Sequence, residues 1–193
     1  MLPPWRSPLS SAIHRNRSKP YSRYFQLATV TPEGYPTNRT VVFRGFLDDE
    51  QSSLKIITDL RSAKIQEIES QKIGEICWYF TKTREQFRIS GNLRLITVKE
   101  AELDLQKARK IAWHDLSDGA RSQFAWPDPA QPAADKEAFE IDPLDPHSPL
   151  NNFCLLLLIP KKIDHLQLRG DPQQRCIYQL EKDGTWSSQL VNP

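Results

Sequence analysis

The stretch YFQLATVTPEGYPTNRTVVFRGF, residues 24–46, decides the fold class. Its first part, Tyr24–Thr31, is rich in aromatic and β-branched residues and is typical of a strand. Thr31-Pro32-Glu33-Gly34 predicts a turn, because proline presets φ and glycine supplies a positive φ. Strand character returns over Asn38–Phe46. The stretch therefore predicts a hairpin of two antiparallel strands.

More strands are expected on the carboxyl side of this hairpin. Their expected ranges are 53–58, 74–81, 86–98, 153–159, 175–181 and 185–191. Phe87 and Ile89 alternate with polar neighbours, as a half-buried strand requires. Lys182-Asp183-Gly184 predicts another hairpin. Pro160 is expected to end the apolar strand at 153–159, because proline lacks the N–H that a sheet needs.

Three helices are expected between the strands. The first is Leu9–Arg17, with Ser7 before Pro8 as cap and first residue. The second runs from Asp59 or Ser62 to Gln71, and the third follows the capping box Thr97-Val98-Lys99-Glu100 to about Leu116. Because most connections are hairpins, we expect a mainly β, α+β fold, an antiparallel barrel with appended helices. We expect one domain over 1–193, with a Pro-rich surface excursion at about 127–152.

Composition excludes several classes of protein. The chain has 193 residues, 38% of them hydrophobic and 26% charged, which is the composition of a globular protein. Its longest apolar run, Phe153–Ile159, is seven residues, far short of the ~20 that span a bilayer. The opening residues, with two early prolines, do not resemble a secretory signal. Cys77, Cys154 and Cys176 are widely spaced, which favours reduced, buried thiols in a cytoplasmic protein over disulfides or a metal site.

Charge is distributed unevenly along the chain. The net charge of +2 combines a net +7 over residues 1–99 with a net −5 over residues 100–193. A nucleic-acid surface usually needs a strongly basic domain, so the pattern favours a local anion site instead. We therefore expect neither a nucleic-acid partner nor a membrane partner. The alternative is that the basic half binds nucleic acid, which predicts that the protein is retained on DNA in a salt-dependent way.

The first of three basic clusters is Arg39-Thr40-Val41-Val42-Phe43-Arg44. Side chains alternate along a strand, so an ideal strand places Arg39 and Arg44 on opposite faces. Each could contact a different part of a long ligand, or one could simply be solvated.

The second cluster, Thr58-Asp59-Leu60-Arg61-Ser62-Ala63-Lys64, lies where a strand ends and a helix begins. A hydroxyl, a lysine and free backbone N–H groups at a helix start can bind a phosphate. Ordinary capping by Asp59 or Ser62 explains the same residues equally well.

The third cluster is Arg84-Glu85-Gln86-Phe87-Arg88. The Gln86 amide can donate and accept hydrogen bonds toward a planar heterocycle, or it can be a polar, outward-facing strand position. Outside these clusters, His114-Asp115 is a poor catalytic pair, because adjacent helical residues do not face each other. The sequence contains no glycine-rich dinucleotide or triphosphate loop.

Taken in order, the clusters resemble the pyridoxamine 5'-phosphate oxidase family of FMN-binding split β-barrels. Arg39–Arg44 is similar to the family's Arg-x-Val-Leu-Leu-Lys strand, and Ile57–Lys64 to its Tyr-Thr-Asn-x-x-Ser-Arg-Lys. Glu85–Arg88 corresponds to its Arg-Gln-Val-Arg strand. The family's terminal pattern is matched by Arg175-Cys-Ile-Tyr-Gln179, Trp186 and Pro193. The likeness covers residues 25–96 and 153–193.

Three further motifs look closer still to one subfamily, of oxidase-related FMN-binding proteins. These motifs are Pro4-Trp5-Arg6, Arg121-Ser-Gln-Phe-Ala-Trp126 and Leu168-Arg-Gly-Asp-Pro172.

The resemblance implies a homodimer that holds FMN in a cleft between the two barrels. It implies that Arg39, Ser62 and Lys64 hold the FMN phosphate. The other implied cofactor contacts are Val41, Val42, Phe43, Arg44, Ile57, Thr58, Gln86 and Arg175. No metal is expected. The flavin itself is expected to carry the chemistry, with an electrostatic role for Arg44.

The substrate grip departs from the family pattern. The family's terminal Arg-Leu-His-Asp-Arg is replaced here by Asp171-Pro-Gln-Gln-Arg175, and the acidic Asp171 would repel a phosphate ester. The Tyr and Arg that grip pyridoxal phosphate align with Trp113 and, loosely, with Leu116 or Ser117. FMN binding therefore carries over, whereas the pyridoxamine phosphate substrate does not.

Two functional hypotheses follow from the resemblance. The first is an FMN-dependent oxidoreductase of the oxidase or flavin reductase type, with an unknown small-molecule substrate. The second is a non-catalytic FMN-binding protein that stores flavin or acts as a sensor.

Overall fold

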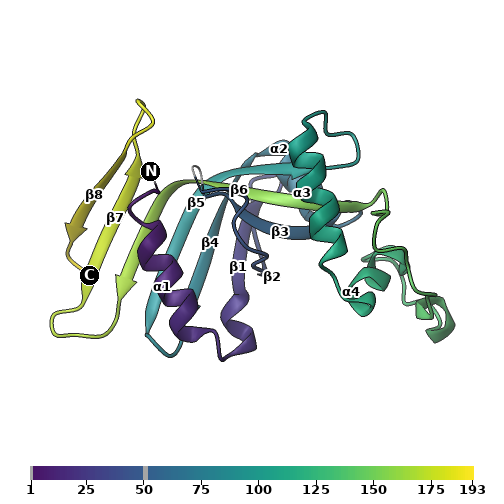
Figure 1. The fold of residues 1–193 in the computed structure, drawn as a ribbon, viewed down its shortest axis with the longest axis horizontal. Coiled ribbons are helices and arrows are strands. Elements are labelled where there is room, and N and C mark those ends of the chain that lie inside the picture. Colours follow the sequence, from purple (N-terminus) through teal and green to yellow (C-terminus); the bar gives the residue numbers. More distant parts are fainter. Residues whose placement is uncertain (1, 50–51) are drawn as a thin grey trace. The chain divides into compact units, whose positions relative to one another are not determined.

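The computed structural model describes residues 2–49 and 52–193 and shows a mainly β, α+β fold (Figure 1). Its α-helices are α1 (Arg6–Asn16), α2 (Lys64–Ser70), α3 (Leu103–His114) and α4 (Asp118–Ser122). Its strands are β1 (Tyr24–Val30), β2 (Pro36–Val42), β3 (Leu54–Asp59), β4 (Ile73–Phe80), β5 (Glu85–Ile96), β6 (Phe153–Gln167), β7 (Gln174–Leu180) and β8 (Trp186–Val191). Short 3₁₀ turns occupy Pro20–Arg23, Gln123–Ala125 and Lys136–Phe139.

The strands form one eight-stranded antiparallel sheet in the order β2-β1-β4-β5-β6-β7-β8, with β3 paired to β6. The predicted antiparallel α+β class is therefore confirmed. Within the described residues the sheet does not close on itself. An open sheet of this kind agrees with the predicted split barrel.

The chain divides into two compact units. The first comprises the described parts of Met1–Ile56, Gln66–Arg94 and Leu157–Pro193. The second comprises Ile57–Ile65 and Leu95–Leu156. The single domain over 1–193 stays a prediction.

The core of the first unit is built by strand alternation. Inward residues of β1, β4 and β5 are fully buried, because every second side chain of these strands points to the same face. At the centre lies Trp78, whose ring centroid is 5.0 Å from Phe25, 4.9 Å from Phe43 and 5.0 Å from Phe80. Its indole N–H donates to the Ser22 carbonyl at 2.9 Å, which satisfies the polar atom of a buried side chain.

Helix α1 covers part of this core (Figure 1). It buries Leu9, Ala12 and Asn16. The Asn16 amide donates to the Ala12 carbonyl and to Thr83 Oγ1, at 2.8 and 3.0 Å. Trp5, just before the helix, is fully buried and makes an edge contact with the Trp186 ring at 5.8 Å. The helix is thus fixed at both of its ends.

Both predicted hairpins are present. β1 and β2 pair from Tyr24↔Val42 to Val30↔Pro36, and Gly34 takes a φ of +90° in the turn between them. β7 and β8 pair from Arg175↔Val191 to Leu180↔Trp186, with Gly184 at a φ of +84°. In both turns a glycine occupies the conformation that other residues avoid.

Two helix starts differ from the prediction. α1 begins at Arg6, after a turn in which the Arg6 N–H donates to the Pro3 carbonyl at 2.9 Å, so Ser7 is not its cap. The Thr97 hydroxyl accepts a hydrogen bond from the Lys99 N–H at 3.2 Å, and this closes a turn instead of a helix. α3 therefore begins only at Leu103. In both cases a local turn competes with the expected cap.

Pro160 does not end its strand, because β6 continues to Gln167. β6 pairs with β7 only from Lys162 onward, so the missing N–H of Pro160 removes no hydrogen bond from that ladder. The neighbouring backbone approaches closely at this point. A Cβ on Gly91 would lie 2.1 Å from the Ile159 carbonyl oxygen, so only glycine fits there.

The second unit has its own core, formed by Trp113, Leu116, Phe124 and Phe153. Two buried arginines stabilise it through backbone carbonyls. Arg109 donates to the carbonyls of Leu150 and Phe153 at 2.7–3.0 Å. Arg121 donates to the carbonyl of Leu116 and to that of His114 at 3.2 Å, which places its charge at the C-terminal end of α3.

The predicted Pro-rich excursion is largely exposed, as expected. It is nevertheless attached to the core of the second unit. The Trp113 indole donates to the Asp145 carbonyl at 2.9 Å, and Leu144 and Leu150 pack against the buried cluster. No helix in the described part of the chain has the length and apolar character that a membrane span requires.

Candidate functional site

Lys64, Thr58 and Ser62 form a compact cluster in the second unit, which we call the hydroxyl–lysine cluster. The Lys64 ammonium donates to Thr58 Oγ1 at 3.1 Å and to Ser62 Oγ at 2.9 Å. The two hydroxyl oxygens lie 3.4 Å apart. Ser62 Oγ also donates to the Asp59 carbonyl at 2.7 Å, which fixes its rotamer. The structure therefore brings together three of the residues that the sequence singled out, around one cation.

Arg61 holds the loop that carries this cluster. Its guanidinium makes hydrogen bonds of 2.6–3.2 Å to the Asp59 carboxylate, and it also binds Asp128 and the carbonyls of Phe124 and Trp126. Burial would raise the pKa of Asp59, but the hydrogen bonds from Arg61 outweigh it and hold that pKa below its usual range. Asp59 also accepts from the Asn152 amide at 2.9 Å. Arg61 is thus a structural cation.

Arg39, on β2 in the first unit, has a different environment. It donates to the Glu67 carboxylate at 2.8 Å and to Thr37 Oγ1 at 2.9 Å, and it also contacts Thr29 Oγ1. Burial would raise the pKa of Glu67, but hydrogen bonds from Thr29, Thr37 and Arg39 hold it below its usual range. Glu67 thus stays ionised and balances the charge of Arg39. No sequence pattern announces this pair, because its partners lie 28 residues apart.

Past the end of β2 the chain leaves the strand, so Arg44 does not lie on the expected strand face. Phe43 is buried against Trp78, and its N–H donates to the Arg23 carbonyl at 2.8 Å. Arg44 is exposed, and its N–H donates to the Lys55 carbonyl at 2.9 Å. Partial burial and the nearby Arg23 lower the pKa of Arg44. Over the described ranges neither Arg23 nor Arg44 forms an ion pair, so the end of β2 carries uncompensated positive charge.

Val41 and Val42 lie at the end of β2, opposite Phe25 and Tyr24, and both are half-buried. Ile57 packs against the buried cluster of the second unit. These three predicted contacts offer mainly backbone and apolar surface.

Gln86 lies on the outward face of β5, next to Cys77 of β4. Its Oε1 atom accepts from Cys77 Sγ at 3.8 Å, and its strand partner is Tyr79. Gln86 is only partly buried. Its side chain is therefore accessible to a ligand at this face, as a contact to a heterocycle requires.

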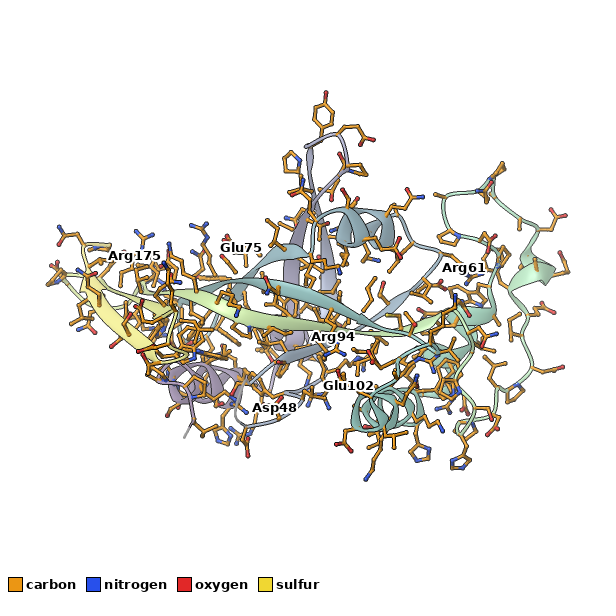
Figure 2. The ribbon with its side chains drawn as sticks, turned by 90° about the horizontal axis from the view of Figure 1, so that it is seen from above. Asp48, Arg61, Glu75, Arg94, Glu102 and Arg175 are labelled. Atoms are coloured by element: carbon orange, nitrogen blue, oxygen red, sulfur yellow. The ribbon has the colours of Figure 1, made fainter. Side chains whose placement is uncertain are left out.

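An ion ladder crosses the same outward face, from β4 to β7. Glu75 binds Arg88 at 2.8 Å, Arg88 approaches Asp164 at 3.9 Å, and Asp164 binds Arg175 through two bonds of 2.9 and 2.7 Å. Figure 2 labels Glu75 and Arg175, the two ends of the ladder. The hydrogen bonds from Arg175 hold the pKa of Asp164 below its usual range. Arg175 was predicted from its motif, whereas no sequence signal indicated Asp164, which fixes the orientation of the Arg175 guanidinium.

Neither a metal site nor a reactive thiol is evident. Over residues 2–49 and 52–193, no three His, Cys, Asp or Glu side chains are grouped as metal ligands. All three cysteines are free, but only Cys154 is fully buried, so the prediction of buried thiols is wrong for Cys77 and Cys176. Burial raises the pKa of Cys154 to about 12, which keeps it an unreactive thiol.

Comparison with known sequences gives the family. A family model described as pyridoxamine 5'-phosphate oxidase, FMN-binding domain, matches residues 2–97. The pyridoxine/pyridoxamine 5'-phosphate oxidase 2 of Arabidopsis thaliana is 40% identical, over 98% of this chain and 97% of its own length. The pyridoxine/pyridoxamine 5'-phosphate oxidase of Chelativorans sp. strain BNC1 is 41% identical, over 39% of this chain and 34% of its own length.

Solved structures share the fold. A pyridoxamine 5'-phosphate oxidase-related, FMN-binding protein from Nostoc punctiforme PCC 73102 is 54% identical, with a TM-score of 0.96 and full coverage of both chains. PhzG from Burkholderia lata 383, solved with tetrahydrophenazine-1-carboxylic acid, has a TM-score of 0.74 at 18% identity, over 97% of this chain and 89% of PhzG. At that identity the likeness concerns the fold alone.

Fold and sequence together define an FMN-binding split-barrel protein. The chain belongs to the pyridoxamine 5'-phosphate oxidase family, and its cofactor is FMN. The hydroxyl–lysine cluster fits this cofactor, because an ammonium with two adjacent hydroxyls provides the donors that a phosphate monoester needs. The matched range also contains every proposed cofactor residue except Arg175.

Proposed function

We propose that the protein is an FMN-dependent oxidoreductase whose substrate differs from pyridoxamine 5'-phosphate. The observation that carries the proposal is the hydroxyl–lysine cluster, which lies inside the range matched by the FMN-binding domain. Relatives in the family are named as oxidases, which supports a redox reaction.

In this proposal Lys64, Ser62 and Arg39 hold the FMN phosphate, with Thr58 beside them. Lys64 contributes an ammonium group whose hydrogen bonds to two hydroxyls can be exchanged for bonds to phosphate oxygens. Arg39 contributes through the donors that Glu67 leaves available, and Glu67 partly compensates its charge.

The flavin ring is held by different groups in the proposal. Gln86 donates and accepts from its accessible amide. Arg175, oriented by Asp164, and the exposed Arg44 place positive charge toward the ring. The backbone of Val41–Phe43 and Ile57 borders the cofactor. Bound FMN supplies two-electron redox chemistry, and positive charge near its pyrimidine ring favours the reduced anion.

The substrate-side residues support a change of substrate. Trp113 is fully buried with its indole N–H on the Asp145 carbonyl, and Leu116 is also buried. Neither residue offers an exposed donor to a substrate phosphate, and Ser117, the other loosely aligned residue, is exposed but caps α4 by accepting from the Ala120 N–H at 3.3 Å. Asp171 is exposed and acidic at a position where the family has a cation. We therefore infer a substrate without a phosphate ester at this position.

We further propose a homodimer in the cytoplasm, with FMN at the subunit interface. The outward sheet face that carries Gln86 and the Glu75–Arg175 ladder is polar and only partly buried in this chain. A second copy of the chain packed on this face would bury it and would add further contacts to FMN.

The test is an anaerobic titration of the FMN-loaded protein with candidate donors, followed by flavin absorbance. The panel contains pyridoxamine 5'-phosphate, pyridoxine 5'-phosphate, their unphosphorylated forms, NADH and NADPH. We expect bleaching by at least one compound without a phosphate ester on the pyridoxine scaffold, and slow or no bleaching by the two phosphate esters. Rapid reduction by the phosphate esters would refute the altered substrate. Flavin that no donor reduces would favour the storage or sensor alternative.

A further inference from the structure

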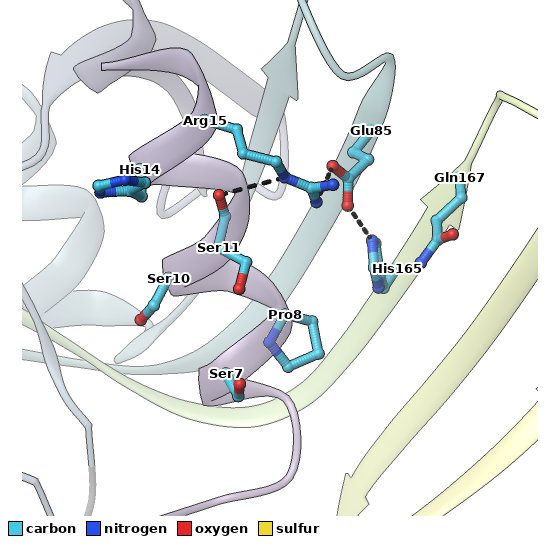
Figure 3. A pocket seen from close by; sticks show the side chains of 9 residues that line it. All are labelled: Ser7, Pro8, Ser10, Ser11, His14, Arg15, Glu85, His165 and Gln167. Carbon is cyan, nitrogen blue, oxygen red and sulfur yellow. Dashed lines mark hydrogen bonds and ion pairs between the residues drawn. The ribbon is translucent and has the colours of Figure 1, made fainter.

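A pocket of about 680 Å³ lies in the first unit, between α1 and the strands β5 and β6 (Figure 3). One wall is α1, which contributes the hydroxyls of Ser7 and Ser11; the Ser10 hydroxyl, also in the lining, already accepts a hydrogen bond from Arg6. The other wall is formed by Glu85, His165 and Gln167. The pocket is a shallow recess that is largely open to solvent, and nothing in the proposed flavin chemistry uses it.

The strand wall contains two buried polar side chains. Glu85 is 4% exposed and His165 is 2% exposed. The His165 Nε2 and Glu85 Oε2 atoms are 3.0 Å apart, and Glu85 Oε1 accepts from Arg15 Nη2 at 2.8 Å. The imidazole is stacked on the Phe87 ring with centroids 4.0 Å apart. The hydrogen bond to Glu85 and the stacking on Phe87 therefore fix the position of the imidazole.

The pair determines which ring nitrogen of His165 is available. Burial would raise the pKa of Glu85, but hydrogen bonds from His165 and Thr83 and the charge of Arg15 hold it below its usual range. An ionised carboxylate only accepts hydrogen bonds, so Nε2 of His165 must carry the hydrogen. In a neutral ring this makes Nδ1 an acceptor. Nδ1 has no hydrogen-bond partner among the residues that the structure describes.

The pocket is separate from the proposed flavin contacts. Glu85 precedes Gln86 on β5, and His165 follows Asp164 on β6. Neighbouring side chains of a strand point to opposite faces of a sheet. The pocket therefore faces away from Gln86 and from the Asp164–Arg175 pair.

We propose that this pocket binds a small, neutral, polyhydroxylated molecule of the sugar or polyol class. Arg15 and Glu85 form an ion pair at 2.8 Å, so this pair adds no net charge to the lining, and a neutral ligand is favoured. Hydroxyl groups of the ligand can donate to Nδ1 of His165. They can also exchange hydrogen bonds in both directions with the serine hydroxyls and with the Gln167 amide.

The experiment titrates FMN-loaded protein with D-ribose and D-glucose in glycerol-free buffer, by calorimetry or ligand-observed NMR. We expect saturable binding of at least one sugar. Ser7→Ala/Ser11→Ala alters two exposed helix positions. It should weaken that binding ~10-fold, because two hydrogen bonds to the ligand are lost. Ser70→Ala, an exposed serine on α2 outside the pocket, should bind like the wild type.

His165→Gln adds a second variant, because glutamine can still donate to Glu85 but lacks the Nδ1 acceptor. It should also lose sugar affinity. If it fails to fold, the serine variants alone decide the question. Absence of saturable binding, or equal binding by the double serine variant and the wild type, would overturn the proposal. Tighter binding of ribose 5-phosphate than of ribose would overturn the neutral class of ligand.

Discussion

Arg39 and Lys64 were both expected to hold the FMN phosphate, yet the structure gives them hydrogen-bond partners of different kinds. Arg39 binds the buried carboxylate of Glu67 at 2.8 Å, so its charge is compensated within the fold. Lys64 binds two hydroxyls, whose oxygens carry no formal charge. A cation in a sequence motif can therefore serve either a ligand or a buried acid of the same fold, and the motif alone does not distinguish the two. A cation that already balances a buried acid acts mainly on stability.

Removing Arg39 should give the largest effect. Arg39→Ala leaves Glu67 buried without its cation and should lower the free energy of unfolding by about 3 kcal/mol, measured by urea denaturation. Arg17→Ala, which removes an exposed arginine, should change it by less than ~0.5 kcal/mol. Arg39→Ala/Glu67→Gln should recover most of the loss, since no buried charge remains. Equal stability of Arg39→Ala and the wild type would show that the pair is not a structural one.

Lys64→Ala should act on the cofactor instead. It should weaken FMN binding by roughly 10- to 150-fold, the range for a lost hydrogen bond to a charged group. Lys72→Ala, at an exposed position beyond α2, should bind FMN like the wild type. Fluorescence titration of the apoprotein measures both constants. Similar losses in the two variants would remove Lys64 from the phosphate site.

The Glu67 carboxylate should make stability depend on acid. Its pKa in the folded state lies below its ordinary value of 4.5, so ionised Glu67 stabilises the fold above about pH 4.5. That stabilisation is lost as the pH falls through the folded-state pKa. Urea denaturation at pH 7 and pH 3.5 should therefore show a smaller loss for Glu67→Gln than for the wild type. A wild-type protein with no greater acid sensitivity than Glu67→Gln would contradict this assignment.

The smallest effect is expected at Asp128. This residue is the exposed end of the Arg61 network, with a side chain that is 66% exposed. Asp128→Asn should change the free energy of unfolding by at most ~0.5 kcal/mol and leave FMN affinity unchanged. Asp59→Asn, which removes the charge of the part-buried partner of Arg61, should destabilise the protein more. A larger effect at Asp128 than at Asp59 would contradict the assignment of Asp59 as the main partner of Arg61.

Local signals predicted most of the fold. The turns at Gly34 and Gly184 and the alternation of β5 need only nearest neighbours, and they are present as expected. The prediction that Pro160 ends its strand was wrong, because the effect of a proline depends on which strand pairs with that position, and pairing is a tertiary property. The helix start predicted from the Thr97 capping box was wrong, because a local turn uses the same hydroxyl.

The subfamily motifs show why site prediction is harder. Arg121 binds the carbonyls that end α3, and Phe124 lies in the core of the second unit. Trp5 is fully buried just before α1, and Arg169 donates to the Lys82 carbonyl at 2.8 Å. These residues stabilise the fold, although their motifs could equally have marked a site. Likewise Glu67 and Asp164, which determine how Arg39 and Arg175 behave, are distant in sequence from both.

The most direct test of the central claim compares FMN with riboflavin, which lacks the phosphate. We expect wild-type apoprotein to bind FMN at least ~30-fold more tightly than riboflavin, and Lys64→Ala to lose most of that preference while its riboflavin affinity is unchanged. Equal binding of the two flavins by the wild type, or an unchanged preference in Lys64→Ala, would contradict the assignment of the hydroxyl–lysine cluster to the FMN phosphate.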